Sequence, residues 1–106
     1  MQPSGYVSLN EAKDQLSIEH ENPVHDDRIN RLLAAAEKAA LQFTQIDSLD
    51  DLVESPSQSP PTIPEDVKSA ILMHVEMEFE RDEKTAAGLL AAFERLLWPY
   101  RQGLGV

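Results

Sequence analysis

The sequence predicts an all-α fold, a small four-helix domain with one long irregular Pro/Ser-rich loop between helices two and three. Apolar residues recur at the three- and four-residue spacing of an α-helix in four segments. No segment shows the strict alternation of apolar and polar residues that is typical of a β-strand. The apolar content is mostly leucine and alanine, which are good helix formers, while aromatic residues make up only 6% of the chain.

The first predicted helix follows Ser8. Ser8 is a good N-cap, and Glu11 stands three residues later, where it completes a capping box. Leu9, Ala12 and Leu16 then recur at helical spacing. A helix of about three turns is too short to be stable alone, so we expect it to dock on the other helices.

The second predicted helix begins at Asn22 and Pro23, an N-cap followed by proline in the first turn. Its apolar stripe contains Ile29, Leu32, Leu33, Ala36, Ala40 and Phe43. Further apolar positions widen the stripe beyond that of an ordinary surface helix: Ala34, Ala35, Ala39 and Leu41. The surplus predicts a second close contact, either with another helix of the chain or with a neighbouring subunit.

The helical pattern stops over a long stretch, at about 45–63. This stretch contains the run Ser55-Pro56-Ser57-Gln58-Ser59-Pro60-Pro61, which cannot hold a continuous helix or strand. Irregular stretches of this length are uncommon inside small domains and are often functional. It is not predicted to be a domain linker, because the chain that follows is too short for a core of its own.

The third predicted helix has Thr62 as a possible cap, Pro64 in its first turn and Glu65 to close a capping box. Apolar residues lie on more than one of its sides, and it becomes charged from Glu78 to Lys84. The fourth helix is predicted after Thr85 and carries Leu89, Leu90, Phe93, Leu96 and Leu97. Pro99 stops it, and an extended tail follows, so that the tail region covers 98–106.

Composition limits the function. The chain has 106 residues, enough for one hydrophobic core, so we expect a single domain over 1–106. Its 9 Lys+Arg and 19 Asp+Glu give a formal net charge of −10, which disfavours non-specific binding to nucleic acid or membranes. There is no cysteine, which excludes disulfides, thiol nucleophiles and thiolate zinc sites. With no signal peptide and no apolar stretch of the roughly 20 residues that span a bilayer, we expect a soluble protein of the cytosol.

The residues do not form a recognisable catalytic or metal-binding motif. Glu21 and His25, and likewise His74 and Glu78, share a helical face, but a metal site needs three or four converging ligands. We expect His74 to pack at the edge of the core, and His20 and His25 to be solvated. No enzymatic activity and no cofactor are therefore predicted, and an interaction protein is favoured.

The order of the segments resembles the head–tail connector (adaptor) proteins of tailed bacteriophages. The first helix carries their Leu-x-Glu-x-Lys/Arg pattern at Leu9, Glu11 and Lys13, and an acidic turn follows it at 19–22. The strongest similarity is the proline-led start of the third helix, Ile63-Pro64-Glu65-Asp66-Val67-Lys68-x-Ala70. The leucine-rich last helix ends in Pro99-Tyr100-Arg101, as in that family.

The resemblance implies a structural virion protein that assembles from the host cytoplasm into the virion neck. The protein would form a homo-oligomeric ring of about a dozen subunits beneath the phage portal protein. The ring would receive the next neck or tail protein, and DNA would pass through its channel without specific binding.

Three sets of residues are candidates for these roles. For the subunit interface we predict Leu33, Ala35, Ala39, Met73 and Met77. For contact with the portal or neck we predict Trp98, Tyr100 and Arg101, because large aromatic side chains and arginine are enriched at interface centres. As an acidic channel lining that repels DNA phosphates we predict Asp47, Asp50, Asp51, Glu54, Glu76, Glu78 and Glu80.

Each set has an alternative reading. The apolar stripes can be entirely internal core, the acidic residues an ordinary solvated surface, and Trp98 a cap on the core of the protomer. For the whole chain, one alternative is a small acidic helical regulator, of the antitoxin or anti-repressor type, that binds a basic partner. Another is a helical, metal-containing enzyme subunit.

Overall fold

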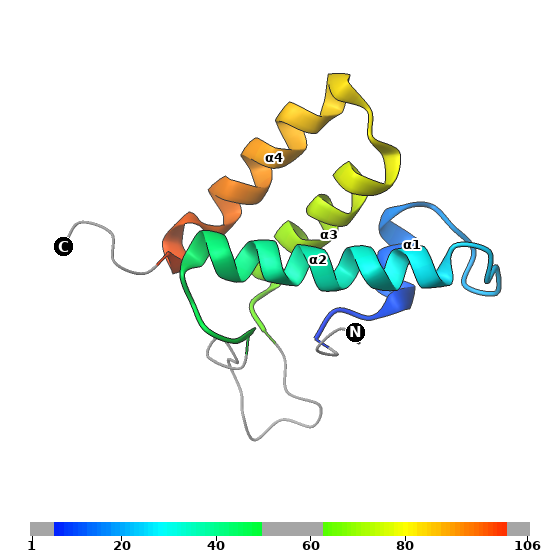
Figure 1. Cartoon of the computed structure of the whole chain (residues 1–106), viewed down its shortest axis with the longest axis horizontal. Helices are drawn as coiled ribbons and strands as arrows, with labels where there is room; N and C mark the ends of the chain where they lie inside the picture. Colours follow the sequence, from blue (N-terminus) through cyan, green and yellow to red (C-terminus); the bar gives the residue numbers. More distant parts are fainter. Residues whose placement is uncertain (1–5, 50–62, 102–106) are drawn as a thin grey trace.

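Four α-helices and one 3₁₀ turn make up the regular structure of the computed structural model, which describes residues 6–49 and 63–101 (Figure 1). They are α1 (Leu9–Gln15), α2 (Asp26–Thr44), α3 (Glu65–Glu80), α4 (Glu83–Leu97) and the 3₁₀ turn η2 (Trp98–Tyr100). The described residues contain no strand, and the all-α prediction is confirmed. Within the same residues, no helix is long and apolar enough to cross a bilayer.

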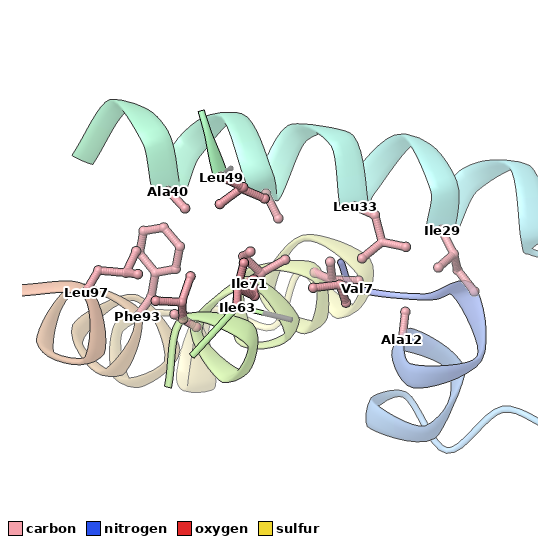
Figure 2. Close-up of a cluster of buried hydrophobic side chains, with 14 residues drawn as sticks. Val7, Ala12, Ile29, Leu33, Ala40, Leu49, Ile63, Ile71, Phe93 and Leu97 are labelled. Atoms are coloured by element: carbon pink, nitrogen blue, oxygen red, sulfur yellow. The ribbon is translucent and has the colours of Figure 1, made fainter. Parts of the chain in front are cut away.

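The core lies between α2 on one side and α3 with α4 on the other. In Figure 2, Ile29, Leu33 and Ala40 point from α2 toward these helices, while Phe93 and Leu97 point from α4 toward α2. The buried cluster consists of Val7, Ala12, Ile29, Leu33, Ala36, Ala40, Leu49, Ile63, Val67, Ala70, Ile71, Val75, Phe93 and Leu97. α3 contacts each of the other three helices, in line with the prediction that it is apolar on more than one side.

The capping box of α1 is present as predicted. The Ser8 side-chain oxygen accepts a hydrogen bond from the Glu11 amide at 3.1 Å, and Glu11 Oε1 accepts one from the Ser8 amide at 3.0 Å. The other carboxylate oxygen of Glu11 pairs with Lys68 Nζ of α3 at 3.0 Å. The residue that closes the cap therefore also docks this short helix on α3.

The lysine of α1 is fully buried. Lys13 is only 1% exposed, and its ammonium donates to the backbone carbonyls of His20 at 2.9 Å and Asn22 at 2.8 Å. It also pairs with Asp26 Oδ1 at 2.6 Å. Two carbonyls accept hydrogen bonds from the ammonium and the Asp26 carboxylate supplies the opposite charge, which lowers the cost of burying Lys13.

α2 begins later than predicted, and the proposed cap is wrong. Asn22 Oδ1 accepts from the Val24 amide at 3.1 Å, so its side chain closes a turn before the helix. Pro23 also precedes the helix, and His25 occupies the N-cap position without a side-chain cap bond. The connection is bent because the Asn22 carbonyl points to Lys13.

Two further helix starts differ from prediction. Pro64 stands immediately before α3 and not inside its first turn; Thr62 lies outside the described residues. α4 begins at Glu83 and not after Thr85, because the Asp82 side chain caps it by accepting from the Lys84 amide at 2.9 Å. Arg81, with φ of 52°, ends α3 in the left-handed conformation.

We expect Lys13→Met to lower the free energy of unfolding by about 3 kcal/mol, because two carbonyls lose their common donor and a carboxylate loses its counter-charge. Lys38→Met is the matched control, since Lys38 is exposed on α2. It should change stability by no more than about 0.5 kcal/mol. Urea denaturation followed by circular dichroism at the helical band measures both, and equal losses would contradict the structural role of Lys13.

Partial burial favours a higher pKa for Glu11, but the hydrogen bonds from Ser8 and the charge of Lys68 outweigh it and lower the pKa below 4.5. The ionised Glu11 carboxylate therefore contributes its full stabilisation of the folded state above pH 4.5, and this contribution is lost as the pH falls through the lowered folded-state pKa. We expect the wild type to exceed Glu11→Gln in stability at pH 6 and the difference to shrink toward pH 3. Denaturation curves across this range test it. In a Lys68→Met background this stability difference should change less with pH, because the charge that lowers the Glu11 pKa is gone.

Candidate interaction surfaces

Aromatic side chains gather where the C-terminal ends of α2 and α4 meet η2. The Phe43 ring lies 6.3 Å from that of Phe93 and 6.4 Å from that of Trp98, centroid to centroid. Phe93 is 3% exposed and belongs to the core, whereas Trp98 is 54% exposed. The aromatic cluster, defined as Phe43, Phe93, Trp98, Tyr100 and Arg101, thus joins the core to a large apolar side chain on the surface.

The guanidinium of Arg101 holds the outer part of the aromatic cluster. Its central carbon lies 5.3 Å from the Phe43 ring centroid and 5.5 Å from that of Trp98. These distances allow cation–π attraction to both rings. Arg101 is half-buried, so the contact orients Trp98 before any partner is present.

Tyr100 fixes η2 to the start of α3. Its hydroxyl donates to Asp66 Oδ1 at 2.7 Å, and its ring packs against the buried cluster. Of the three residues predicted for portal contact, only Trp98 presents a largely exposed apolar surface. Tyr100 and Arg101 mainly position the turn that carries it.

The residues predicted for the subunit interface differ in exposure. Leu33 is 0% exposed and lies in the core of the protomer itself. At this position the structure agrees with the alternative that the apolar stripe is internal core. Ala35 is exposed on α2, and Ala39 is partly buried against the core. Met73 and Met77 are half-buried on α3.

The residues predicted for the acidic lining also differ in exposure. Asp47 and Glu80 are exposed, whereas Asp50, Asp51 and Glu54 lie outside the described residues. Glu76 accepts a hydrogen bond from Gln15 Nε2 of α1 at 2.7 Å, so it takes part in docking α1. Glu78 is half-buried, and its charge acts on His74.

The histidines have separate environments. His74 packs its ring against Phe93 at 5.1 Å, and burial lowers its pKa despite the nearby Glu78 carboxylate. His20 is exposed and pairs with Asp14 at 2.6 Å. His25 is half-buried with its ring edge against Phe79 at 5.3 Å, so the expectation that it is fully solvated is wrong. In the part of the chain that the structure describes, no group of three or more His, Cys, Asp or Glu residues could hold a metal ion.

Two surface features were missed in the sequence. Leu90, 41% exposed, lies on α4 on a face that the core does not cover. On α2, the exposed residues Arg31 and Lys38 are seven positions apart and therefore lie on one side of the helix. The seven-residue spacing of these two cations could have been recognised in the sequence. From the sequence we considered only the apolar stripe of this helix and not the charged residues on its exposed side.

Comparison with known proteins gives a family. The family model described as phage gp6-like head-tail connector protein matches residues 6–95, which include α1, α2, α3 and most of α4. No curated protein and no solved structure matches the chain.

The exposure of the aromatic cluster predicts unequal effects of truncating its rings. Phe93→Ala should lower the free energy of unfolding by about 3 kcal/mol because it opens a cavity in the core. Trp98→Ala should cost about half as much, because more than half of this residue is already in water. Thermal or urea denaturation measures both. A loss for Trp98→Ala as large as that for Phe93→Ala would show that Trp98 caps the core and is not held ready for a partner.

Proposed function

This chain belongs to the phage gp6-like head-tail connector family, and we propose that it forms a ring adaptor between the phage portal and the neck or tail. Membership makes the chain a structural component of the phage virion that interacts with other head and tail proteins. The ring of about a dozen copies, its channel and its docking on the portal are the proposal. The observation that carries it is the family match across nearly the whole helical domain.

The uncovered surface of α4 supports assembly of the protomer with other copies. A subunit of a cyclic ring uses two different patches, one for each neighbour. α4 buries only Phe93 and Leu97, so much of its surface is free for a neighbour. Leu33 is excluded from the proposed lateral contact by its burial, and Ala35, Ala39, Met73 and Met77 remain in it.

The charge of the chain suits a DNA conduit. A net charge of −10 repels phosphate, so DNA would pass the channel without adhering to its wall. We assign Asp47, Glu80 and the half-buried Glu78 to the proposed lining. Glu76 contributes charge there while it holds α1, and the remaining proposed members are Asp50, Asp51 and Glu54.

The aromatic cluster supports a docking role on the portal. Trp98 offers a large apolar side chain whose orientation is set by Phe43 and Arg101. An anchor that is ordered in advance loses less conformational entropy on binding, and tryptophan is the residue most enriched at such centres. We therefore place Trp98 in the proposed contact with the portal or the next neck protein, with Tyr100 and Arg101 supporting it.

The proposal is tested by mixing the purified chain with the portal protein encoded by the same phage. Electron microscopy should show an added ring on one face of the portal. Trp98→Ala should weaken docking at least about tenfold, because it removes the exposed anchor while the fold remains. Val24→Ala is the matched control, since Val24 is 76% exposed and lies before α2, away from the aromatic cluster.

Two results would contradict the proposal. A wild-type chain that neither binds the portal nor adds density to it lacks the proposed function. If Trp98→Ala docks as tightly as Val24→Ala, the aromatic cluster is not the portal contact.

A further inference from the structure

The side of α2 that faces away from the core is basic. Arg31, Ala35, Lys38 and Gln42 follow one another at spacings of four, three and four residues, and all four are exposed. This set, the basic stripe, contains no acidic residue, although the chain has a net charge of −10. Of the acidic residues of α2, Asp26 pairs with Lys13 and Glu37 is buried, while the exposed Asp27 lies one turn before Arg31 on the same side, so this side is basic from Arg31 onward.

α4 carries a stripe of the opposite charge on a face that the core leaves uncovered. Glu83, Ala87, Leu90 and Glu94 recur at spacings of four, three and four residues, and all are exposed; Trp98, assigned above to the portal contact, follows one turn after Glu94. Leu90 and Trp98 account for two of the three large exposed hydrophobic residues among the described ones. The set from Glu83 to Glu94, the acidic stripe, thus combines two carboxylates with apolar surface that no other part of the described protomer covers.

The two stripes are complementary in layout. In the basic stripe two cations flank the small Ala35, and in the acidic stripe two carboxylates flank Ala87 and Leu90. At a rise of 1.5 Å per residue, Arg31 and Lys38 are separated by about 10 Å and Glu83 and Glu94 by about 16 Å along their helices. Long arginine and lysine side chains span that difference. In the part of the chain that the structure describes, none of these four residues has an intramolecular ion pair.

One protomer cannot bring its own two stripes together. The core faces of α2 and α4 point toward one another across the core (Figure 2), so the exposed stripes lie on different sides of the molecule. A second copy of the chain can supply the missing partner for each. Pairing of two different patches repeats from copy to copy and forms a ring when the rotation between successive copies closes.

We propose that the basic stripe of one copy packs on the acidic stripe of the next copy, with Ala35 against Ala87 and Leu90. This inference rests on the proposed ring and adds the pairing of α2 with α4 to its lateral contact. The small side chains allow the two helices to approach closely, and Leu90 becomes buried between them. In the proposed register Arg31 faces Glu83 and Lys38 faces Glu94, so that unlike charges meet at both ends of the contact.

The absence of cysteine from the chain makes cross-linking a clean test. Ala35→Cys and Ala87→Cys are prepared as separate single variants and treated with a short bismaleimide. The mixture should give a covalent dimer, while each variant alone gives none above background. The reaction is run on the free chain at high concentration and on the chain bound to its portal, and a mixture-specific dimer in either supports the proposal.

Charge reversal tests the register. Lys38→Glu in the Ala35→Cys chain should lower the dimer yield about tenfold, and so should Glu94→Lys in the Ala87→Cys chain. Combining both reversed chains should restore the yield, because the pair is re-formed with opposite signs. Arg95→Glu in the Ala87→Cys chain is the matched control, since Arg95 is exposed on α4 outside the acidic stripe, and it should leave the yield unchanged.

Several results would overturn the pairing. One is no dimer in the mixture, free or on the portal; another is equal dimer from Ala35→Cys alone, which would indicate a symmetric contact between two α2 helices. A third is retention of duplex DNA by the wild type that Lys38→Glu abolishes while cross-linking is unchanged, because the basic stripe would then be a DNA-binding surface. Portal docking by the wild type separates the two proposals: docking without the cross-link refutes the pairing alone, whereas a cross-link without docking refutes the portal adaptor.

Discussion

The buried ammonium of Lys13 is the interaction on which the arrangement of the helices depends. α1 has only seven residues and would not persist without tertiary contacts. By binding the carbonyls of His20 and Asn22 and the carboxylate of Asp26, Lys13 fixes the path from α1 into α2. From the first turns of α2, Arg28 donates to the Phe79 carbonyl at 3.0 Å and covers that ring at 4.5 Å. A cation thus compensates the negative C-terminal end of α3, which has no basic residue in its own last turn.

The packing of the helices leaves part of α4 uncovered, although α4 lies along α3 and is held by it. α1, α2 and α3 are tied together by buried apolar residues and by polar contacts such as Glu11 with Lys68. α4 follows α3 after the left-handed Arg81 and contributes Phe93 and Leu97 near its end. The first part of α4 is largely exposed, and a connector that must contact neighbours and other virion proteins needs such surface.

The sequence predicted the features that depend on near neighbours. The capping box of Ser8 and Glu11 and the stop at Pro99 are local, and the helices and the all-α class follow from periodicity. The predicted start of α2 was wrong because the Asn22 carbonyl accepts a hydrogen bond from Lys13, nine residues earlier and outside the reach of a local capping pattern. The candidate sites were harder to predict, because periodicity identifies an apolar stripe but does not show how much of it the rest of the protomer covers. Leu33 and Ala35 were predicted together, but the structure buries the first and exposes the second.

Net charge explains why a basic stripe matters in this chain. Two copies that each carry a charge of −10 repel one another in most orientations. An orientation that places Arg31 and Lys38 against Glu83 and Glu94 replaces part of this repulsion with attraction, and it also buries Leu90. The acidic surface would then act twice in the proposed ring: it would keep DNA from adhering, and it would penalise every contact between copies except the one that closes the ring.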